Sequence, residues 1–320
     1  MNQDQALHVV MGASGGIGSA VCRRLAEEGH AVRAVNRSGK METPDGVEIL
    51  AADATDPAST RQACQGAAVV YNCVHPRPGE EYERFVTMAG NIIDGAEAAG
   101  ASLILAASVY PYGKVDRPMT EDMPDNPVEP TGVLHAKGFQ MAMDAHEKGR
   151  VQVAVGRSSN YFGPNAGRSY AGDGIFYNAL AGDPAMVIGD VDTRHTYTYV
   201  DDFADGLITL ATRDEALGQV WHVPSAETIT TRQFIDMAYS QAGRETKIRA
   251  GTRLPLTVIS LFSSKMKFAL QVLYQFDRPF IVDYSKFEKA FGANPMPHEE
   301  GVSRTLEWYR ASYDFSDGSG

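Results

Sequence analysis

The sequence has few cysteines, no cluster of basic residues and no long apolar run. The three cysteines, Cys22, Cys64 and Cys73, have no metal-ligand spacing, which argues against a disulfide framework or a metal site. Lysine and arginine total 29 against 40 acids, a formal net charge of −11, so no nucleic-acid or anionic-membrane partner is expected. No apolar run approaches the roughly 18 residues of a membrane-spanning helix, and the N-terminus has no signal-peptide pattern. These absences predict reduced thiols in a cytoplasmic protein.

What the sequence does contain is a regular alternation of short apolar runs and amphipathic segments. Continuous apolar strands separated by helical periods predict a parallel sheet covered on both faces, and right-handed crossovers then give a Rossmann-like, doubly wound α/β fold. The expected strands are residues 6–11, 31–35, 47–53, 67–72, 102–108, 151–157 and 219–224, and the main expected helices are residues 15–28, 82–99, 131–148, 201–212 and 231–242.

The alternation is clear in the first half of the chain and weaker in the second. Residues 1–160 are therefore predicted to form the Rossmann domain. Residues 161–314, with more glycine- and proline-bearing loops, are predicted to form mainly a smaller substrate-binding cap, with segments near 190–224 returning to the sheet. The polar, glycine-rich residues 315–320 are predicted to be a disordered tail.

A glycine-rich stretch, "VVMGASGGIGSAV", follows the first expected strand and opens the first expected helix. Gly12 permits the tight turn, Gly15 lets the backbone approach a pyrophosphate, and Gly18 lets the helix pack on the strand. The helix N-terminus offers free N–H groups to the phosphates. With Ser14 and Ile17, these glycines are predicted to bind a dinucleotide coenzyme.

The second expected strand ends in Asn36, Arg37 and Ser38, where an enzyme that prefers NAD usually carries an acid for the ribose hydroxyl. Because an arginine pairs well with a 2′-phosphate, the sequence predicts NADP in preference to NAD. Asp53, followed by Ala54 after the third strand, is placed to reach the adenine, or it caps the next helix.

Further motifs extend over nearly the whole chain. They are the glycine loop, "DATDP" (53–57), "AASVYPYG" (106–113), Lys137, "GRSSNYFGP" (156–164), "YTYVDDFADGL" (197–207) and residues 278–310. In this order and spacing they resemble the extended short-chain dehydrogenase/reductase family, the group of NAD(P)-dependent nucleotide-sugar epimerases and dehydratases. The resemblance implies the fold, while the reaction depends on the residues of the site.

The resemblance implies a catalytic serine, a tyrosine, and a lysine four residues after the tyrosine. Ser108 matches the serine and Lys137 the lysine, which would also hold the nicotinamide ribose. The tyrosine position falls on Val133, and no tyrosine lies between Tyr112 and Tyr161. Three alternatives follow: another residue donates the proton, solvent protonates a substrate such as an activated alkene, or the protein binds coenzyme without turnover.

Tyr110 is the preferred replacement, because related dehydratases place an acid/base glutamate two residues after the serine. His135 is close to Lys137 in sequence, but a separation of two residues places it on a different face of the helix. By the same resemblance, Cys73 and Val74 are expected along the cofactor cleft, and Ser159 is expected near the cofactor.

The substrate residues implied by the resemblance are Asn160, His195 and Arg278. His195 stands where the family has an arginine, and Ser158 and Ser159 replace its usual tyrosine–phenylalanine pair, so a sugar nucleotide is in doubt.

The sequence thus predicts an NADP-dependent oxidoreductase or epimerase/dehydratase-like enzyme with a non-standard proton donor. It would act on a small carbonyl, hydroxyl or activated alkene compound. The alternative is an inactive NADP-binding redox sensor with a regulatory role. A homodimer through the helices near 82–99 and 131–148 is a further expectation, since family members commonly dimerise there.

Overall fold

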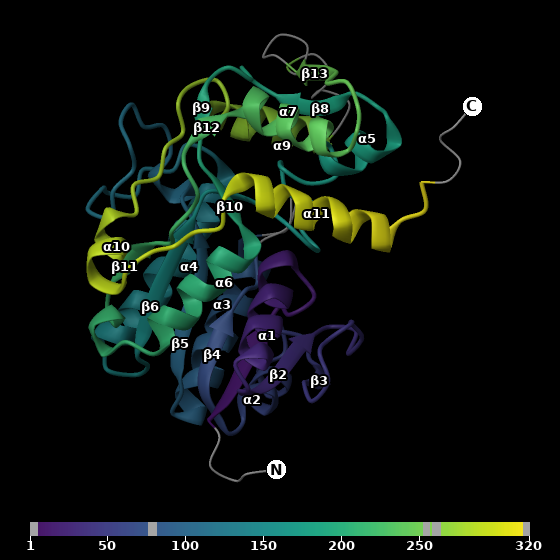
Figure 1. The fold of residues 1–320 in the computed structure, drawn as a ribbon. Coiled ribbons are helices and arrows are strands. Elements are labelled where there is room, and N and C mark those ends of the chain that lie inside the picture. The colour runs from purple at the N-terminus through teal and green to yellow at the C-terminus, as the bar shows by residue number, and fades with distance from the viewer. Residues whose placement is uncertain (1–5, 76–81, 252–256, 258–263, 316–320) are drawn as a thin grey trace.

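The computed structural model describes residues 6–75, 82–251, 257 and 264–315 (Figure 1). The strands are β1 (Leu7–Met11), β2 (Ala31–Asn36), β3 (Glu48–Ala51), β4 (Ala67–Asn72), β5 (Ser102–Ser108), β6 (Val153–Ser158), β7 (Asn160–Phe162), β8 (Ala185–Ile188), β9 (Arg194–His195), β10 (Tyr197–Tyr199), β11 (Val220–His222), β12 (Ile229–Thr230) and β13 (Ile248–Gly251). The α-helices are α1 (Gly16–Glu27), α2 (Pro57–Cys64), α3 (Tyr82–Ala99), α4 (Pro130–Glu147), α5 (Phe176–Ala181), α6 (Val200–Ala211), α7 (Thr231–Gln241), α9 (Ser264–Val272), α10 (Ser285–Phe291) and α11 (His298–Ser312). Single 3₁₀ turns are η1 (Tyr110–Tyr112), η2 (Asp214–Ala216) and η3 (Leu273–Gln275).

A seven-stranded sheet in the order β11-β6-β5-β4-β1-β2-β3 organises the molecule. Every neighbouring pair in it is parallel. The chain moves outward from β1 through β2 to β3 and then crosses back to β4, so the strand order reverses between β1 and β4. The predicted doubly wound Rossmann-like fold is confirmed. Ligands of such sheets bind at the carboxyl ends of the strands beside this reversal.

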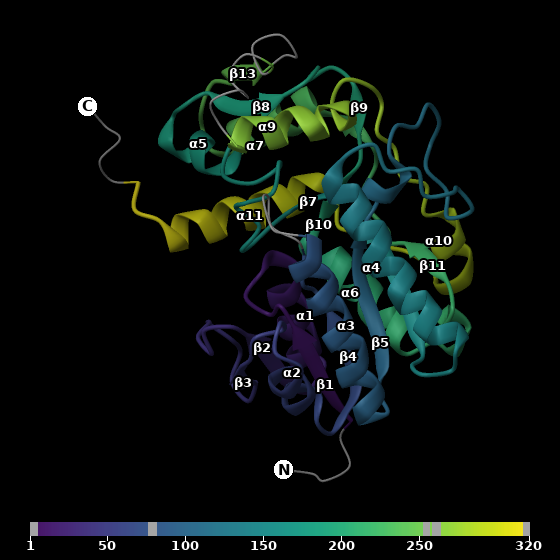
Figure 2. The same cartoon turned by 180° about the vertical axis from the view of Figure 1, so that it is seen from behind.

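Helices cover both faces of the sheet, as Figures 1 and 2 show from opposite sides. Helices α1 and α6 pack together on one face, and α2, α3 and α4 pack on the other. Neighbouring strand residues therefore enter different cores: Val10 and Ile104 pack under α1 and α6, whereas Val9 and Leu103 pack under α3 and α4. Because both faces are buried, the strands are apolar throughout and do not alternate with polar residues.

The second half of the chain forms the cap and also returns to the sheet. Within residues 190–224, β11 extends the sheet by pairing with β6 and α6 covers one face, whereas β9 and β10 pair outside it, with β12 and β7. Residues 316–320 of the predicted tail lie outside the described residues. Among the residues that are described, no helix is both long and apolar enough to cross a membrane.

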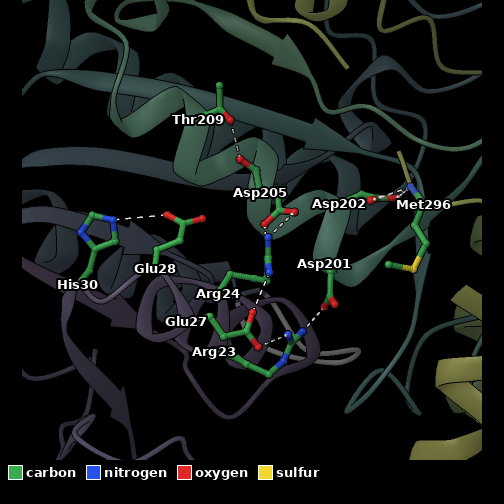
Figure 3. A network of polar contacts seen from close by, with 10 residues as sticks. All are labelled: Arg23, Arg24, Glu27, Glu28, His30, Asp201, Asp202, Asp205, Thr209 and Met296. Atoms are coloured by element: carbon green, nitrogen blue, oxygen red, sulfur yellow. Dashed lines mark hydrogen bonds and ion pairs between the residues drawn. The ribbon is translucent and has the colours of Figure 1, made fainter. Parts of the chain in front are cut away.

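An ionic network joins the two halves of the sheet where α1 meets α6 (Figure 3). Arg23 pairs with Asp201, and Arg24 pairs with Asp205 at 2.6 Å. Both arginines also pair with Glu27. Arg24 is about one-third exposed, so these pairs contribute modestly and mainly fix how the helices are aligned.

Asp202, which Figure 3 shows beside this network, accepts the backbone N–H of Met296 at 3.0 Å and is half-buried. Burial raises the pKa of this carboxyl to about 7, from its ordinary value of 3.8. Between these two values the folded protein retains a proton that the unfolded chain has lost, so this group's contribution to stability falls as pH rises across that window.

The variant Asp202→Asn cannot ionise and retains an acceptor for Met296. We expect it to raise the melting temperature at pH 8 by a few degrees, at about 2–4 °C per kcal/mol, and to change it little near pH 4. Thermal unfolding at the two pH values measures this difference. A variant less stable than the wild type at pH 8 would contradict the prediction.

Candidate active site

A cleft of about 570 Å³ lies at the carboxyl ends of the parallel strands, where the strand order reverses. The predicted cofactor residues that line it are Gly12, Ser14, Gly15, Asn36, Arg37, Asp53, Ala54, Cys73 and Val74. The predicted cofactor residues that are outside its lining are Ile17, Gly18, Ser38, Lys137 and Ser159.

The three glycines predicted to bind the coenzyme, Gly12, Gly15 and Gly18, meet different constraints. Gly12 has a φ of +81°, and a Cβ there would lie 2.9 Å from the backbone carbonyl of Cys73. A Cβ on Gly18 would overlap the carbonyl oxygen of Gly12 and lie 2.8 Å from Cα of Ala13, so Gly18 keeps α1 close to β1. A Cβ on Gly15 would meet only the Gly12 oxygen at 3.5 Å, an ordinary contact. The protein itself therefore leaves room at Gly15, the position where the dinucleotide-binding motif has a glycine that lets the backbone approach a pyrophosphate.

The side chain of Asn36 stabilises the turn after β2. The amide oxygen accepts the N–H of Ser38, the hydroxyl of Ser38 and the N–H of Gly39, at 2.8–2.9 Å. This oxygen is thus occupied, and Asn36 is poorly placed to accept a ribose hydroxyl as an acid at this position would. Arg37 follows it on the exposed rim of the cleft.

Asp53 lies on the rim of the cleft, at the start of the turn that follows β3. Its carboxylate accepts the N–H and the hydroxyl of Thr55 at 2.9 and 2.8 Å, and these bonds, with the nearby charges of Arg84 and Arg37, lower the pKa of Asp53. The carboxylate therefore shapes the local turn, while Asp56 provides the side-chain cap of α2. Arg84, which the sequence analysis did not single out, brings a second guanidinium to this end of the cleft.

Cys73 and Val74 form the wall of the cleft beside Gly12. The N–H of Cys73 donates to the carbonyl of Met11 at 2.9 Å, which extends the pairing of β4 with β1. Burial raises the pKa of the Cys73 thiol well above its ordinary value, so this thiol is an unreactive packing group.

The predicted catalytic residues lie beyond this lining, around the end of β5 and the start of α4. Ser108 accepts the N–H of Tyr110 at 3.4 Å through its Oγ. Helix α4 begins against this turn, because a Cβ on Gly132 would lie 2.9 Å from the carbonyl oxygen of Tyr110. Val133 is 44% exposed on the first turn of α4, and Lys137 is exposed one turn later.

The ring of Tyr110 packs against His135, edge to face, with 5.6 Å between ring centroids. His135 in turn lies 5.5 Å from the ring of His75. Residues two apart on a helix point in nearly opposite directions, so Tyr110 contacts a different face of α4 from the one that carries Val133 and Lys137.

Burial dominates the protonation of this group. It raises the pKa of Tyr110 well above its ordinary value, and the neighbouring tyrosines and Glu129 act in the same direction. It lowers the pKa of His75 to about 4 and that of His135 to about 3, so both imidazoles are neutral at pH 7. Tyr110 is therefore a protonated phenol at neutral pH, which holds a proton that it can donate and is a weaker acid than an ordinary tyrosine.

Two predicted substrate residues belong to a buried polar cluster. Asn160 donates to Nε2 of His195 at 3.0 Å and to the side-chain oxygen of Gln275 at 3.1 Å. His195 is fully buried between Phe276 and Phe280, at ring distances of 4.8 and 5.2 Å. Burial lowers the pKa of His195 to about 3, so it carries no positive charge where the resembling family has an arginine.

The remaining predicted residues are also placed by the structure. Arg278 is partly exposed and pairs with Asp277 at 3.1 Å. Ser159 is 5% exposed, and its hydroxyl has no hydrogen-bond partner in the described part of the chain. Neither residue lines the large cleft.

The cap contributes cleft residues that the sequence analysis missed. Arg168 and Ser169 come from the loop after β7, and Trp308 and Tyr313 come from α11 and the residue after it. They lie more than 100 residues from the glycine loop along the chain, and no local pattern marks them.

Known proteins are similar to this chain in sequence and in fold. The chain matches the NAD-dependent epimerase/dehydratase family over residues 8–223. It is 23% identical over 221 residues to a dTDP-glucose 4,6-dehydratase of Streptomyces griseus, an alignment that covers 68% of this chain and 62% of that protein.

Solved structures agree along nearly the whole chain. An epimerase, Mth375, of Methanothermobacter thermautotrophicus superposes with a TM-score of 0.83 at 18% identity, covering 97% of this chain and 93% of that one. A dTDP-glucose 4,6-dehydratase of Bacillus anthracis, in complex with NAD, superposes with a TM-score of 0.79 at 16% identity, covering 97% of this chain and 98% of that one. At such identities the structures show a shared fold. Family membership rests on the family match, which covers about two-thirds of the sequence. The chain belongs to the NAD-dependent epimerase/dehydratase family.

Proposed function

We propose that the protein is an NADP(H)-dependent oxidoreductase of this family that acts on a small carbonyl or activated alkene compound. The observation that carries the proposal is the cleft at the strand reversal. There the N-terminus of α1 has no side-chain cap and no acid in its first turn, and arginines line the rim. Uncapped helix N–H groups and guanidinium groups are what a dinucleotide phosphate requires.

The preference for NADP rests on the turn after β2. The amide oxygen of Asn36 is occupied within the turn, so the ribose 2′-hydroxyl of NAD finds no acid to receive it. Arg37, on the same rim, is placed to pair with the 2′-phosphate of NADP, and Arg84 adds positive charge at this end.

Fluorescence titration with NADPH and NADH tests the coenzyme assignment. We expect the wild type to bind NADPH more tightly. We expect Arg37→Gln to weaken NADPH binding by about 10–100-fold and NADH binding little, because a hydrogen bond to a charged group contributes about 1.5–3 kcal/mol. A wild type that prefers NADH would overturn the assignment, and a wild type that binds neither coenzyme would overturn the proposed function.

The chemistry proposed for the site follows from the protonation of its residues. A bound nicotinamide would supply or accept the hydride. Ser108 accepts a backbone N–H and retains its own hydroxyl proton, which it can donate to a substrate carbonyl oxygen. Tyr110 is the proposed proton donor, because its raised pKa keeps the phenol protonated at neutral pH.

The proposed substrate carries no nucleotide diphosphate. His195 is neutral and enclosed by aromatic rings, Asn160 uses its amide N–H groups inside the protein, and Arg278 is paired with Asp277. These three positions therefore offer little attraction for a diphosphate. The proposal includes a homodimer through the adjacent outer faces of α3 and α4, which lie side by side in Figure 2.

A further inference from the structure

The loop that follows β7 lies directly on the glycine loop. A Cβ on Gly16 would be 3.3 Å from Cα and Cβ of Ala166, and the amide of Asn165 donates to the hydroxyl of Ser19 at 3.2 Å. Asn165 has a φ of 58°, a left-handed conformation that asparagine tolerates better than most residues. The cap is thus held against the first turn of α1, and the residues that follow Ala166 line the same cleft as Ser14 and Gly15.

Two donors on this cap wall have no partner in the described protein. Arg168 is exposed and forms no ion pair or hydrogen bond with any residue that the structure describes. The hydroxyl of Ser169 is buried and also has no hydrogen-bond partner within the described ranges. A buried hydroxyl without a partner is unfavourable, so a missing acceptor is indicated. In a chain of net charge −11, an unpaired guanidinium at a cleft points to an anionic ligand.

The opposite wall presents matching donors. Helix α1 has 12 residues, begins after Gly15 without a side-chain cap, and has no acid in its first turn. Its free N–H groups and the positive end of its dipole face the cleft. One carboxylate, Asp173, also lines the cap wall, but it accepts the hydroxyl of Tyr309 at 2.7 Å and so is held toward α11.

We propose that Arg168 and Ser169 bind the pyrophosphate of the coenzyme from the cap side, opposite the N-terminus of α1. The inference rests on the proposed function, because it takes the ligand of the cleft to be a nicotinamide dinucleotide. A planar guanidinium can bind two phosphate oxygens at once, and the serine hydroxyl supplies a third donor. The coenzyme then joins the cap to the Rossmann half, and Arg168 acts on the part that NADPH and NADH have in common.

Arg168→Gln and Ser169→Ala test this inference by direct binding of NADPH and NADH to the full chain. We expect Arg168→Gln to weaken both coenzymes by a similar factor, about 10-fold or more, and Ser169→Ala to weaken both by less. Arg168→Lys, which retains the charge and loses the planar guanidinium, should have an affinity for both coenzymes between those of the wild type and Arg168→Gln. Arg249→Gln, on exposed β13 outside the cleft lining, is the matched control and should bind both as the wild type does.

The possible outcomes distinguish a failure of this inference from a failure of the proposed function. A wild type that binds NADPH tightly, with Arg168→Gln unchanged for both coenzymes, removes Arg168 from the site while the proposed function stands. A loss confined to NADPH would move Arg168 to the 2′-phosphate and overturn the pyrophosphate assignment. A wild type that binds neither coenzyme overturns the proposed function itself.

Trp308 gives a second readout that requires no turnover. The chain has two tryptophans, and Trp308 lines the cleft, whereas Trp221 is buried beside Phe291. Reduced nicotinamide absorbs where tryptophan emits, so NADPH bound between the walls should quench Trp308. We expect Trp308→Phe to lose most of the quenching seen in the wild type. Full quenching in that variant would place the coenzyme away from α11 and contradict a site closed by the cap.

Discussion

Replacing Gly18 with alanine is expected to force α1 away from β1 and to abolish NADPH binding. The added Cβ would overlap the carbonyl oxygen of Gly12 and lie 2.8 Å from Cα of Ala13. Both obstacles are backbone atoms, which cannot move aside as a flexible side chain can. Overpacking of this kind costs about 1–3 kcal/mol or more, so the melting temperature should fall on the order of 5 °C or more.

Gly15→Ala is the matched control, because it adds the same methyl group to the same loop. The Cβ would lie 3.5 Å from the Gly12 oxygen, so the melting temperature without coenzyme should stay close to that of the wild type. NADPH binding should nevertheless weaken by about 10-fold or more, since the methyl group would occupy the approach to the pyrophosphate. Thermal unfolding and titration of both variants measure the two effects separately. Equal melting temperatures for Gly18→Ala and the wild type would refute the packing role.

The sheet could be predicted because its signals are local. Each buried strand is a short apolar run, and the glycine loop lies between one such run and a helical period. Leu7–Met11 and Ser102–Ser108 are accordingly strands of the central sheet, close to their predicted bounds. The helix predicted at 131–148 is α4, one residue earlier at each end, because Glu129 caps it by accepting the N–H groups of Thr131 and Gly132.

The site could be predicted only where a residue acts through its neighbours in sequence. Arg168 and Trp308 reach the cleft through the packing of the cap on α1, which no sequence pattern encodes. In the sequence, Asn36 is a neutral residue at a position where NAD-dependent enzymes usually carry an acid. Only the structure shows that its side-chain oxygen already accepts hydrogen bonds within the turn. Asn160 and His195 match substrate positions of the resembling family, yet they bond to each other in the interior. Tertiary contacts, and not residue type, decide the role at these positions.

Removing the hydroxyl of Tyr110 is expected to have the largest effect on turnover. Tyr110→Phe should lower kcat by about 10²–10⁴-fold, the usual range for a lost general acid, and leave the Kd for NADPH unchanged. Oxidation of NADPH with a panel of small carbonyl and activated alkene compounds provides the assay. Near-wild-type turnover in the variant would remove Tyr110 from the mechanism. Tight NADPH binding without turnover of any compound by the wild type would favour a coenzyme-sensing regulator.

Tyr112, two residues after Tyr110, provides the control for that experiment, because its hydroxyl has a structural role. It bonds to Nε2 of the buried His222 at 2.8 Å. Tyr112→Phe leaves that imidazole with an unpaired nitrogen and should reduce stability by about 1–3 kcal/mol. Turnover per folded molecule should be retained. A loss of kcat as large as that of Tyr110→Phe would mean that both variants act by disturbing the β5–η1 turn.

Val133 allows the missing proton donor to be restored directly. Its side chain is 44% exposed on the first turn of α4, so a tyrosine fits there without entering the core. In Tyr110→Phe/Val133→Tyr the phenol would stand one turn before Lys137, whose ammonium lowers the pKa of a nearby phenol. If Tyr110→Phe loses turnover because it lacks a proton donor, the double variant should be at least 10-fold more active than Tyr110→Phe. Its activity should fall as pH rises through the lowered pKa, because a general acid acts in its protonated form. Recovery would show that the chemistry needs a phenol, which either η1 or the first turn of α4 can supply, whereas no recovery would mean that Tyr110 also positions the substrate.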